Sequence, residues 1–172
     1  MGDIQRDTQE PWLRGTHTDV DAAARAVLHG LELADEDVAK WCATLTDAEF
    51  NARPFGLPPL AFHLRHIARS LDRLLSYAEG TQLDATQKAA LRAELDSGAT
   101  RDSLLAEFRA ALHASAARIR AFSPDHYGAA RTVGRAELPT TLGGLLVHCA
   151  DHTQRHVGQV VTTAKLILAM RA

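Results

Sequence analysis

Residues 142–167 read LGGLLVHCADHTQRHVGQVVTTAKLI, and this stretch decides the predicted fold. Apolar side chains recur in it every three or four residues, which is the spacing that places them on one face of a helix. Val157, Val160, Val161 and Ala164 form the more apolar side, and the histidines lie at its edge. We therefore predict a long amphipathic helix, from about residue 139 to about residue 170, that packs one face into a core.

Three more amphipathic helices are predicted upstream by the same periodicity. The first is expected to open near Thr18 and Asp19, because these residue types cap helix N-termini well. The second has Pro58 and Pro59 in its first turn, where proline is tolerated. The predicted ranges are 18–45, 58–78 and 100–122.

Shorter segments connect these helices. A capping box at residues 46–49 predicts one extra turn, and residues 83–95 are predicted to form a short connecting helix. Residues 123–137 are expected to be a loop that can hold a weakly extended segment, and residues 1–15 form a loose lead-in. The fold class is therefore all-α: a four-helix bundle with one or two short connecting helices, forming a single domain over residues 1–172.

Composition narrows the function classes. The formal net charge is −2 and there is no long basic run, so we expect no nucleic-acid partner. No segment approaches the roughly 20 consecutive apolar residues that span a bilayer, and the N-terminus lacks the apolar stretch of a signal peptide. We therefore expect a cytoplasmic protein without a membrane partner.

The cysteines and several arginines are expected to have ordinary structural roles. Cys42 and Cys149 are interpreted as small buried hydrophobic residues, because a secreted disulfide framework normally has more cysteines. Four arginines lie on helix faces near the histidines and are expected to be solvated, with one or two able to hold an anionic ligand: Arg65, Arg69, Arg73 and Arg155.

Histidines are the strongest functional signal among these residues. The chain has nine, and His152 and His156 are four positions apart, so they lie one above the other on one helix face, with His148 one turn earlier. Two imidazoles at this spacing can hold one metal ion, but a catalytic zinc site usually has three protein ligands. The second helix can supply the third ligand from His63 or His66, and periodicity alone favours His63 slightly.

Two motifs resemble those of the DinB/YfiT-like metal-binding family. In that family one helix carries a motif of the type L-x-x-H-[IL], and the last helix carries H-x-x-x-H, often followed by x-G-Q. Here residues 62–67 read FHLRHI and residues 152–159 read HTQRHVGQ. The first motif departs from the pattern, because Leu64 stands two residues before His66 rather than three.

The resemblance covers nearly the whole chain and implies a ligand set. It indicates His66, which precedes Ile67, together with His152 and His156, as ligands of one divalent transition metal ion, with zinc or nickel the best candidates. Metal-bound histidines commonly donate their second ring N–H to a carboxylate or carbonyl. The candidates for a position behind the ligands are His63, His148 and Asp151.

The same resemblance implies an activity and an assembly. Some DinB/YfiT-like proteins are similar to thiol S-transferases that use a low-molecular-weight thiol of the bacillithiol or mycothiol type, and family members are often homodimers. A divalent ion can also activate water, so a hydrolase acting on a small-molecule substrate is the related alternative. Two further alternatives stay open: a non-catalytic protein that binds a metal or small ligand, and a structural dimeric bundle with incidental histidines.

Overall fold

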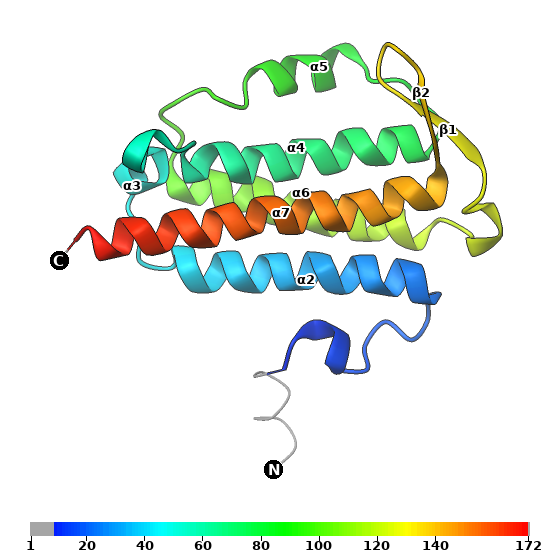
Figure 1. The fold of residues 1–172 in the computed structure, drawn as a ribbon, viewed down its shortest axis with the longest axis horizontal. Coiled ribbons are helices and arrows are strands. Elements are labelled where there is room, and N and C mark those ends of the chain that lie inside the picture. Colours follow the sequence, from blue (N-terminus) through cyan, green and yellow to red (C-terminus); the bar gives the residue numbers. More distant parts are fainter. Residues whose placement is uncertain (1–8, 172) are drawn as a thin grey trace.

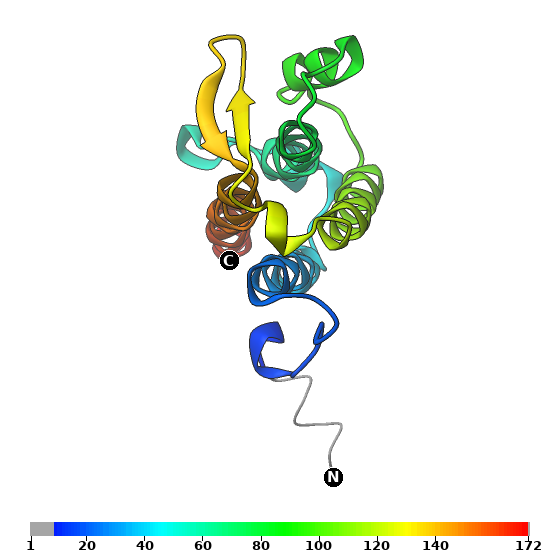
Figure 2. The ribbon, with the colours of Figure 1, turned by 90° about the vertical axis from the view of Figure 1, so that its right-hand side faces the viewer.

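Four long helices lie side by side and form a bundle (Figures 1 and 2). The computed structural model describes residues 9–171, so residues 1–8 of the predicted lead-in lie outside the described residues. The long helices are α2 (Ala22–Cys42), α4 (Leu60–Ala78), α6 (Arg101–Arg120) and α7 (Leu142–Ala169). The shorter elements are η1 (Pro11–Leu13), α3 (Asp47–Asn51), η2 (Pro54–Gly56), α5 (Ala85–Arg92), η3 (Pro124–His126), β1 (Ala130–Val133) and β2 (Leu138–Thr141). The predicted helical bundle is confirmed, and a small two-stranded sheet is added to it.

The directions of the helices require one long crossover. In Figure 1, α2 and α7 run one way, while α4 and α6 run the other way. The ion pairs between α4 and α6 agree, because Arg69 contacts Glu107 and Asp72 contacts Arg118, so residue numbers rise together along the two helices. Parallel neighbours cannot be joined by a tight turn. The chain between them therefore returns along the outer side of α4, and this crossover contains α5 (Figure 1).

Arginines of α4 hold the crossover against the bundle. Arg65 and Arg69 donate hydrogen bonds to backbone carbonyls of the crossover, and Arg73 donates to the Glu94 carboxylate at 2.7 Å. The expectation that these arginines are solvated is wrong for Arg65 and Arg73, which are each 9% exposed, because the crossover covers them. Arg155 is exposed, as expected.

The core lies between the four long helices, as the apolar periodicity predicted. Cys42 and Cys149 belong to this core, and burial raises the pKa of each thiol to about 12. Representative fully buried side chains are Leu28, Val38, Phe50, Leu64, Ile67, Leu71, Phe108, Ile119 and Val160. None of the helices between residues 9 and 171 has both the length and the apolar character needed to cross a bilayer.

Two predicted helix starts shift in the structure. Helix α2 begins at Ala22, because the Asp21 side chain accepts hydrogen bonds from the first-turn backbone N–H groups. Asp19, expected to cap this helix, instead pairs with Arg120 at 2.6 Å. Helix α4 begins at Leu60, so the two prolines precede its first turn rather than form it.

Residues expected to begin the last helix form a strand instead. Strands β1 and β2 pair antiparallel with Ala130 opposite Thr141, which confirms the weakly extended segment and places Pro139 within β2. Helix α7 then begins at Leu142, and the Thr141 hydroxyl caps it by accepting a hydrogen bond from the Gly144 N–H. The hairpin lies at the end of the bundle where α7 begins (Figure 1).

Candidate metal centre

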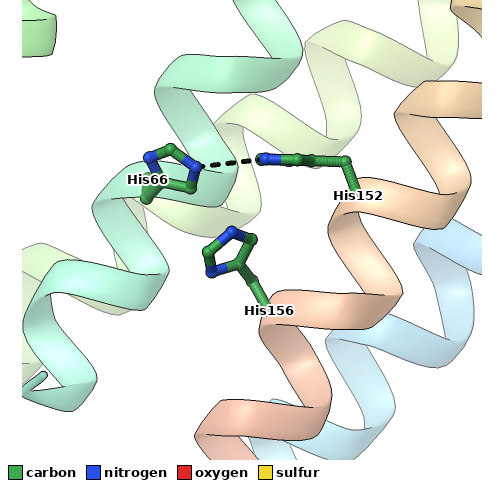
Figure 3. Close-up of side chains that lie close together, drawn as sticks. All are labelled: His66, His152 and His156. Atoms are coloured by element: carbon green, nitrogen blue, oxygen red, sulfur yellow. Dashed lines mark hydrogen bonds between the residues drawn. The ribbon is translucent and has the colours of Figure 1, made fainter. Parts of the chain in front are cut away.

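Three histidines meet where α4 and α7 pack against each other. Because the two helices are antiparallel, His66 of α4 faces His152 and His156 of α7, which are one turn apart. One ring nitrogen from each of the three lies within 4.8 Å of the others. Figure 3 shows the rings directed toward a shared space. All three side chains are partly buried, at the boundary between core and solvent.

His66 is held by a buried carboxylate. Its Nδ1 lies 2.7 Å from Oε2 of Glu94, and Glu94 is only 4% exposed. Burial by itself would raise the pKa of Glu94, but hydrogen bonds from His66 and Arg73 outweigh it and lower the pKa, so the group is an ionised carboxylate. An ionised carboxylate can only accept hydrogen bonds. His66 therefore carries a proton on Nδ1, and in its neutral form the lone pair is on Nε2.

A serine contacts Nδ1 of His152, as the Glu94 carboxylate contacts Nδ1 of His66. Its Nδ1 lies 3.3 Å from the Ser70 Oγ. The Ser70 hydroxyl proton is already used, because Oγ donates to the backbone carbonyls of His66 and Ile67. Ser70 must then accept the hydrogen bond from His152. This places the His152 proton on Nδ1 and leaves a lone pair on its Nε2.

The two lone pairs face each other. Nε2 of His66 lies 3.2 Å from Nε2 of His152, a contact marked by the dashed line in Figure 3. When both rings are neutral with their protons on Nδ1, neither facing nitrogen has a hydrogen to donate, and a cation between them would bind both lone pairs. Two imidazole ligands of one tetrahedral zinc ion, each at about 2.0–2.1 Å, have nitrogens roughly 3.4 Å apart. The residues present therefore fit a divalent metal ion.

His156 completes the group and has a histidine as its partner. Its Nδ1 lies 3.0 Å from Nδ1 of His63, which is 4% exposed. Burial, followed by the charges of neighbouring imidazoles, lowers the pKa of His63 and of His152 to about 4. Burial and His66 also lower the pKa of His156 to about 4. These imidazoles are neutral at physiological pH, which is the form that binds metal ions.

The other predicted residues lie farther from the shared space. His148 is exposed, with its ring centroid 5.4 Å from that of His152. Asp151 is exposed and pairs with Arg155 at 2.6 Å. Within residues 9–171, Glu94 rather than Asp151 contacts a ligand imidazole.

Sequence reasoning missed Glu94 and did not single out Ser70. Glu94 lies 28 residues after His66, in the crossover beyond α5, and no fixed spacing relates it to the histidine motifs. Ser70 lies one turn after His66 on α4, so helical spacing was the one available signal for it.

A second group of possible ligands contains His17, His29 and Glu32. Arg120 donates a hydrogen bond to Nδ1 of His17, which places the His17 proton on Nε2, 2.5 Å from the Glu32 carboxylate. His29 in turn bonds to the Thr16 hydroxyl at 3.0 Å. Every contact of His17 is satisfied by protein, so this group fits a hydrogen-bond network that holds the N-terminal segment against α2.

Comparisons with known proteins agree with this architecture. A conserved protein from Enterococcus faecalis, known from its crystal structure, is similar in fold with a TM-score of 0.70 and 19% sequence identity. The match covers 87% of this chain and 99% of that one. No curated protein matches the sequence significantly. The family model of the DinB superfamily matches residues 30–160, which is more than half of the chain. The chain therefore belongs to the DinB superfamily.

Proposed function

We propose that this protein binds one divalent transition metal ion through His66, His152 and His156 and uses it to activate a small-molecule nucleophile. One observation carries the proposal: the Nε2 atoms of His66 and His152 face each other at 3.2 Å. Glu94 and Ser70 favour protons on the opposite ring nitrogens, so two neutral rings present their lone pairs to each other and suit a shared cation. Zinc and nickel suit a set of imidazole ligands.

The charges around the site favour activation of a bound nucleophile. Arg73 pairs with Glu94 at 2.7 Å, so the carboxylate behind His66 adds no net charge near the ion that neutral imidazoles would hold. When bound, an ion in such a site supplies Lewis acidity that lowers the pKa of a coordinated thiol or water molecule. The protein's residues would fix the orientation of the ligands and keep their lone pairs directed at one point.

The nucleophile is proposed to come from outside the protein. Cys42 and Cys149 are buried, and burial raises the pKa of both thiols to about 12, so neither provides a thiolate at neutral pH. The family resemblance favours a low-molecular-weight thiol of the bacillithiol or mycothiol type, transferred to an electrophilic small molecule. Hydrolysis by water is the alternative within the same site. The expected homodimer and cytoplasmic location stay predictions.

Elemental analysis of untagged protein tests the metal site. We expect about one zinc or nickel ion per chain in the wild type, as for a three-ligand centre, and none in a His152→Ala/His156→Ala variant. A His113→Ala/His126→Ala variant is the matched control, because both of its histidines are exposed and outside the site. A metal-free wild type whose melting temperature ignores added zinc and nickel would refute the proposal.

Turnover assays then test the activity. Metal-loaded wild type should accelerate transfer of a low-molecular-weight thiol to an electrophile, or hydrolysis of an activated ester. The metal-free form and the His152→Ala/His156→Ala variant should not. A stoichiometric metal without metal-dependent turnover in either assay would leave a non-catalytic metal-binding protein as the correct description.

A further inference from the structure

His63 is a buried histidine whose side chain has one hydrogen-bond partner among the described residues, the proposed metal ligand His156. It lies one turn before His66 on α4, and its ring centroid is 5.3 Å from that of His156. The two Nδ1 atoms are 3.0 Å apart, so one of them carries a proton and the other accepts it. The other nitrogen of His63, Nε2, is buried without a hydrogen-bond partner among the described residues.

Metal binding would settle which of the two Nδ1 atoms is the donor. In Figure 3 the nitrogen of His156 that is turned toward the other two rings is the one farther from Cβ, which is Nε2. The contact with His63 is made by the other nitrogen, Nδ1. If His156 binds the ion through Nε2, its proton must be on Nδ1, and it donates to His63. A neutral His63 then accepts at Nδ1 and must carry its own proton on Nε2. That arrangement buries an N–H group without a partner, which proteins rarely do.

Without the ion, the opposite arrangement satisfies more groups. His63 then donates from Nδ1 to Nδ1 of His156, and its buried Nε2 carries no proton. His156 holds its proton on Nε2, where it can donate toward the facing lone pairs of His66 and His152, whose ring centroids are 4.4 and 4.7 Å away. The pair His63–His156 holds two protons in either state, and only their positions differ.

We propose that His63 is the positioning residue for the ligand His156, and that metal loading inverts the tautomers of both histidines. On loading, the Nε2 proton of His156 leaves to solvent. The shared proton moves from His63 to His156 between their Nδ1 atoms, and His63 takes up a proton on Nε2. This inference rests on the proposed metal site. It adds that Nε2 of His156 becomes free to bind the ion only when His63 changes tautomer.

Nuclear magnetic resonance of the imidazole nitrogens tests the inversion directly. Protein labelled with 15N is titrated with zinc, which is diamagnetic, and long-range proton–nitrogen spectra report which nitrogen of each ring is protonated. We expect His63 to be protonated on Nδ1 without zinc and on Nε2 with zinc. His66 should keep its proton on Nδ1 in both states, because Glu94 accepts from it. An unchanged His63 tautomer in zinc-loaded protein overturns the inference.

Two substitutions separate the hydrogen bond from packing. His63→Asn keeps an acceptor, because Oδ1 is bonded to Cγ as Nδ1 is, whereas His63→Leu removes it. We expect zinc affinity to fall about 10- to 100-fold in His63→Leu and to stay within about 3-fold in His63→Asn. His29→Asn is the matched control, since His29 is another buried histidine outside the site and its loss should not change zinc affinity.

The outcomes distinguish this inference from the metal site itself. Equal affinities of the two His63 variants, whether both lowered or both unchanged, would show a packing role only and overturn the inference. If His63→Leu does not fold, the His63→Asn affinity and the spectra of the wild type still decide. A wild type that binds no zinc removes the proposed metal site, whereas one zinc per chain with a fixed His63 tautomer removes only the inversion.

Discussion

Replacing Glu94 with glutamine is expected to weaken zinc binding about 10- to 100-fold, because it disturbs the group that fixes the orientation and tautomer of His66. Glutamine keeps the shape of the side chain but removes its charge. In the wild type the two carboxylate oxygens accept from His66 and from Arg73, each at 2.7 Å. The glutamine amide has one oxygen, so one of these two donors must lose its acceptor.

The magnitude follows from the burial of these groups. Hydrogen bonds to charged groups contribute about 1.5–3 kcal/mol each, and a buried donor left without an acceptor costs about 1–3 kcal/mol. If the amide oxygen turns to Arg73, the amide N–H faces His66 and favours a proton on Nε2, which must be displaced before a metal binds. A 10- to 100-fold loss of affinity corresponds to about 1.4–2.7 kcal/mol, within this range.

Competition with a chelating dye measures the zinc affinity, and thermal unfolding of metal-free protein measures the stability. A loss of about 2 kcal/mol in a domain of this size lowers the melting temperature by roughly 4–8 °C. Glu107→Gln is the matched control. Glu107 pairs at 2.8 Å with Arg69, an arginine of α4 like Arg73, but its own side chain is 38% exposed. A Glu94→Gln variant whose zinc affinity equals that of Glu107→Gln would refute the positioning role of Glu94.

Three further predictions concern the reactivity of the thiols, the pH dependence of stability and stabilisation by zinc. Cys42 and Cys149 should not react with a thiol reagent at pH 8 in native protein, because burial raises the pKa of each thiol to about 12. Both should react after unfolding, and reaction of either in the native state would contradict the prediction. Arg171 and Thr46 hold the pKa of Glu49 at about 2. The stabilisation by this partly exposed carboxylate, on the order of 1 kcal/mol or less, should be complete above about pH 4.5 and be lost as the pH falls toward 2. Denaturant unfolding of Glu49→Gln and wild type should therefore differ at pH 6 and converge near pH 2, and an equal difference at both pH values would refute it. Finally, free zinc at about 100 times its dissociation constant should stabilise the wild type by about 2.7 kcal/mol, and a chelator should remove that gain in a calorimetric scan; no gain would argue against a folded-state site.

The extent of prediction from sequence depends on how far apart the interacting residues lie. His152 and His156 share one helix face, so their spacing alone brings them together, and α4 was expected to supply a partner from the facing helix. Periodicity alone favoured His63 slightly over His66, and it was the family resemblance that indicated His66. The structure brings His66 to the shared space and places His63 behind His156.

Residues whose roles depend on the crossover could not be predicted. Arg65 and Arg73 look like solvated charges when only α4 is considered, and they are buried because the crossover lies over them. Glu94 likewise gains its role from a contact across 28 positions of the chain. Local propensity also misplaced the start of α2, because a tertiary ion pair with Arg120 engages Asp19 and leaves Asp21 to cap the helix.

The topology of the bundle and the chemistry of the site are connected through that crossover. Helices α4 and α6 are parallel neighbours, so the chain between them must return along α4, and there it can place a carboxylate behind a ligand. The two histidine groups show why that partner matters. His17 has an arginine against Nδ1, which forces its proton onto Nε2 toward Glu32, whereas His66 has a carboxylate there, which frees Nε2 for an ion. Histidine pairs alone therefore do not identify a metal site. Whether the group behind each ring accepts or donates a hydrogen bond decides if the lone pair points into the site or away from it.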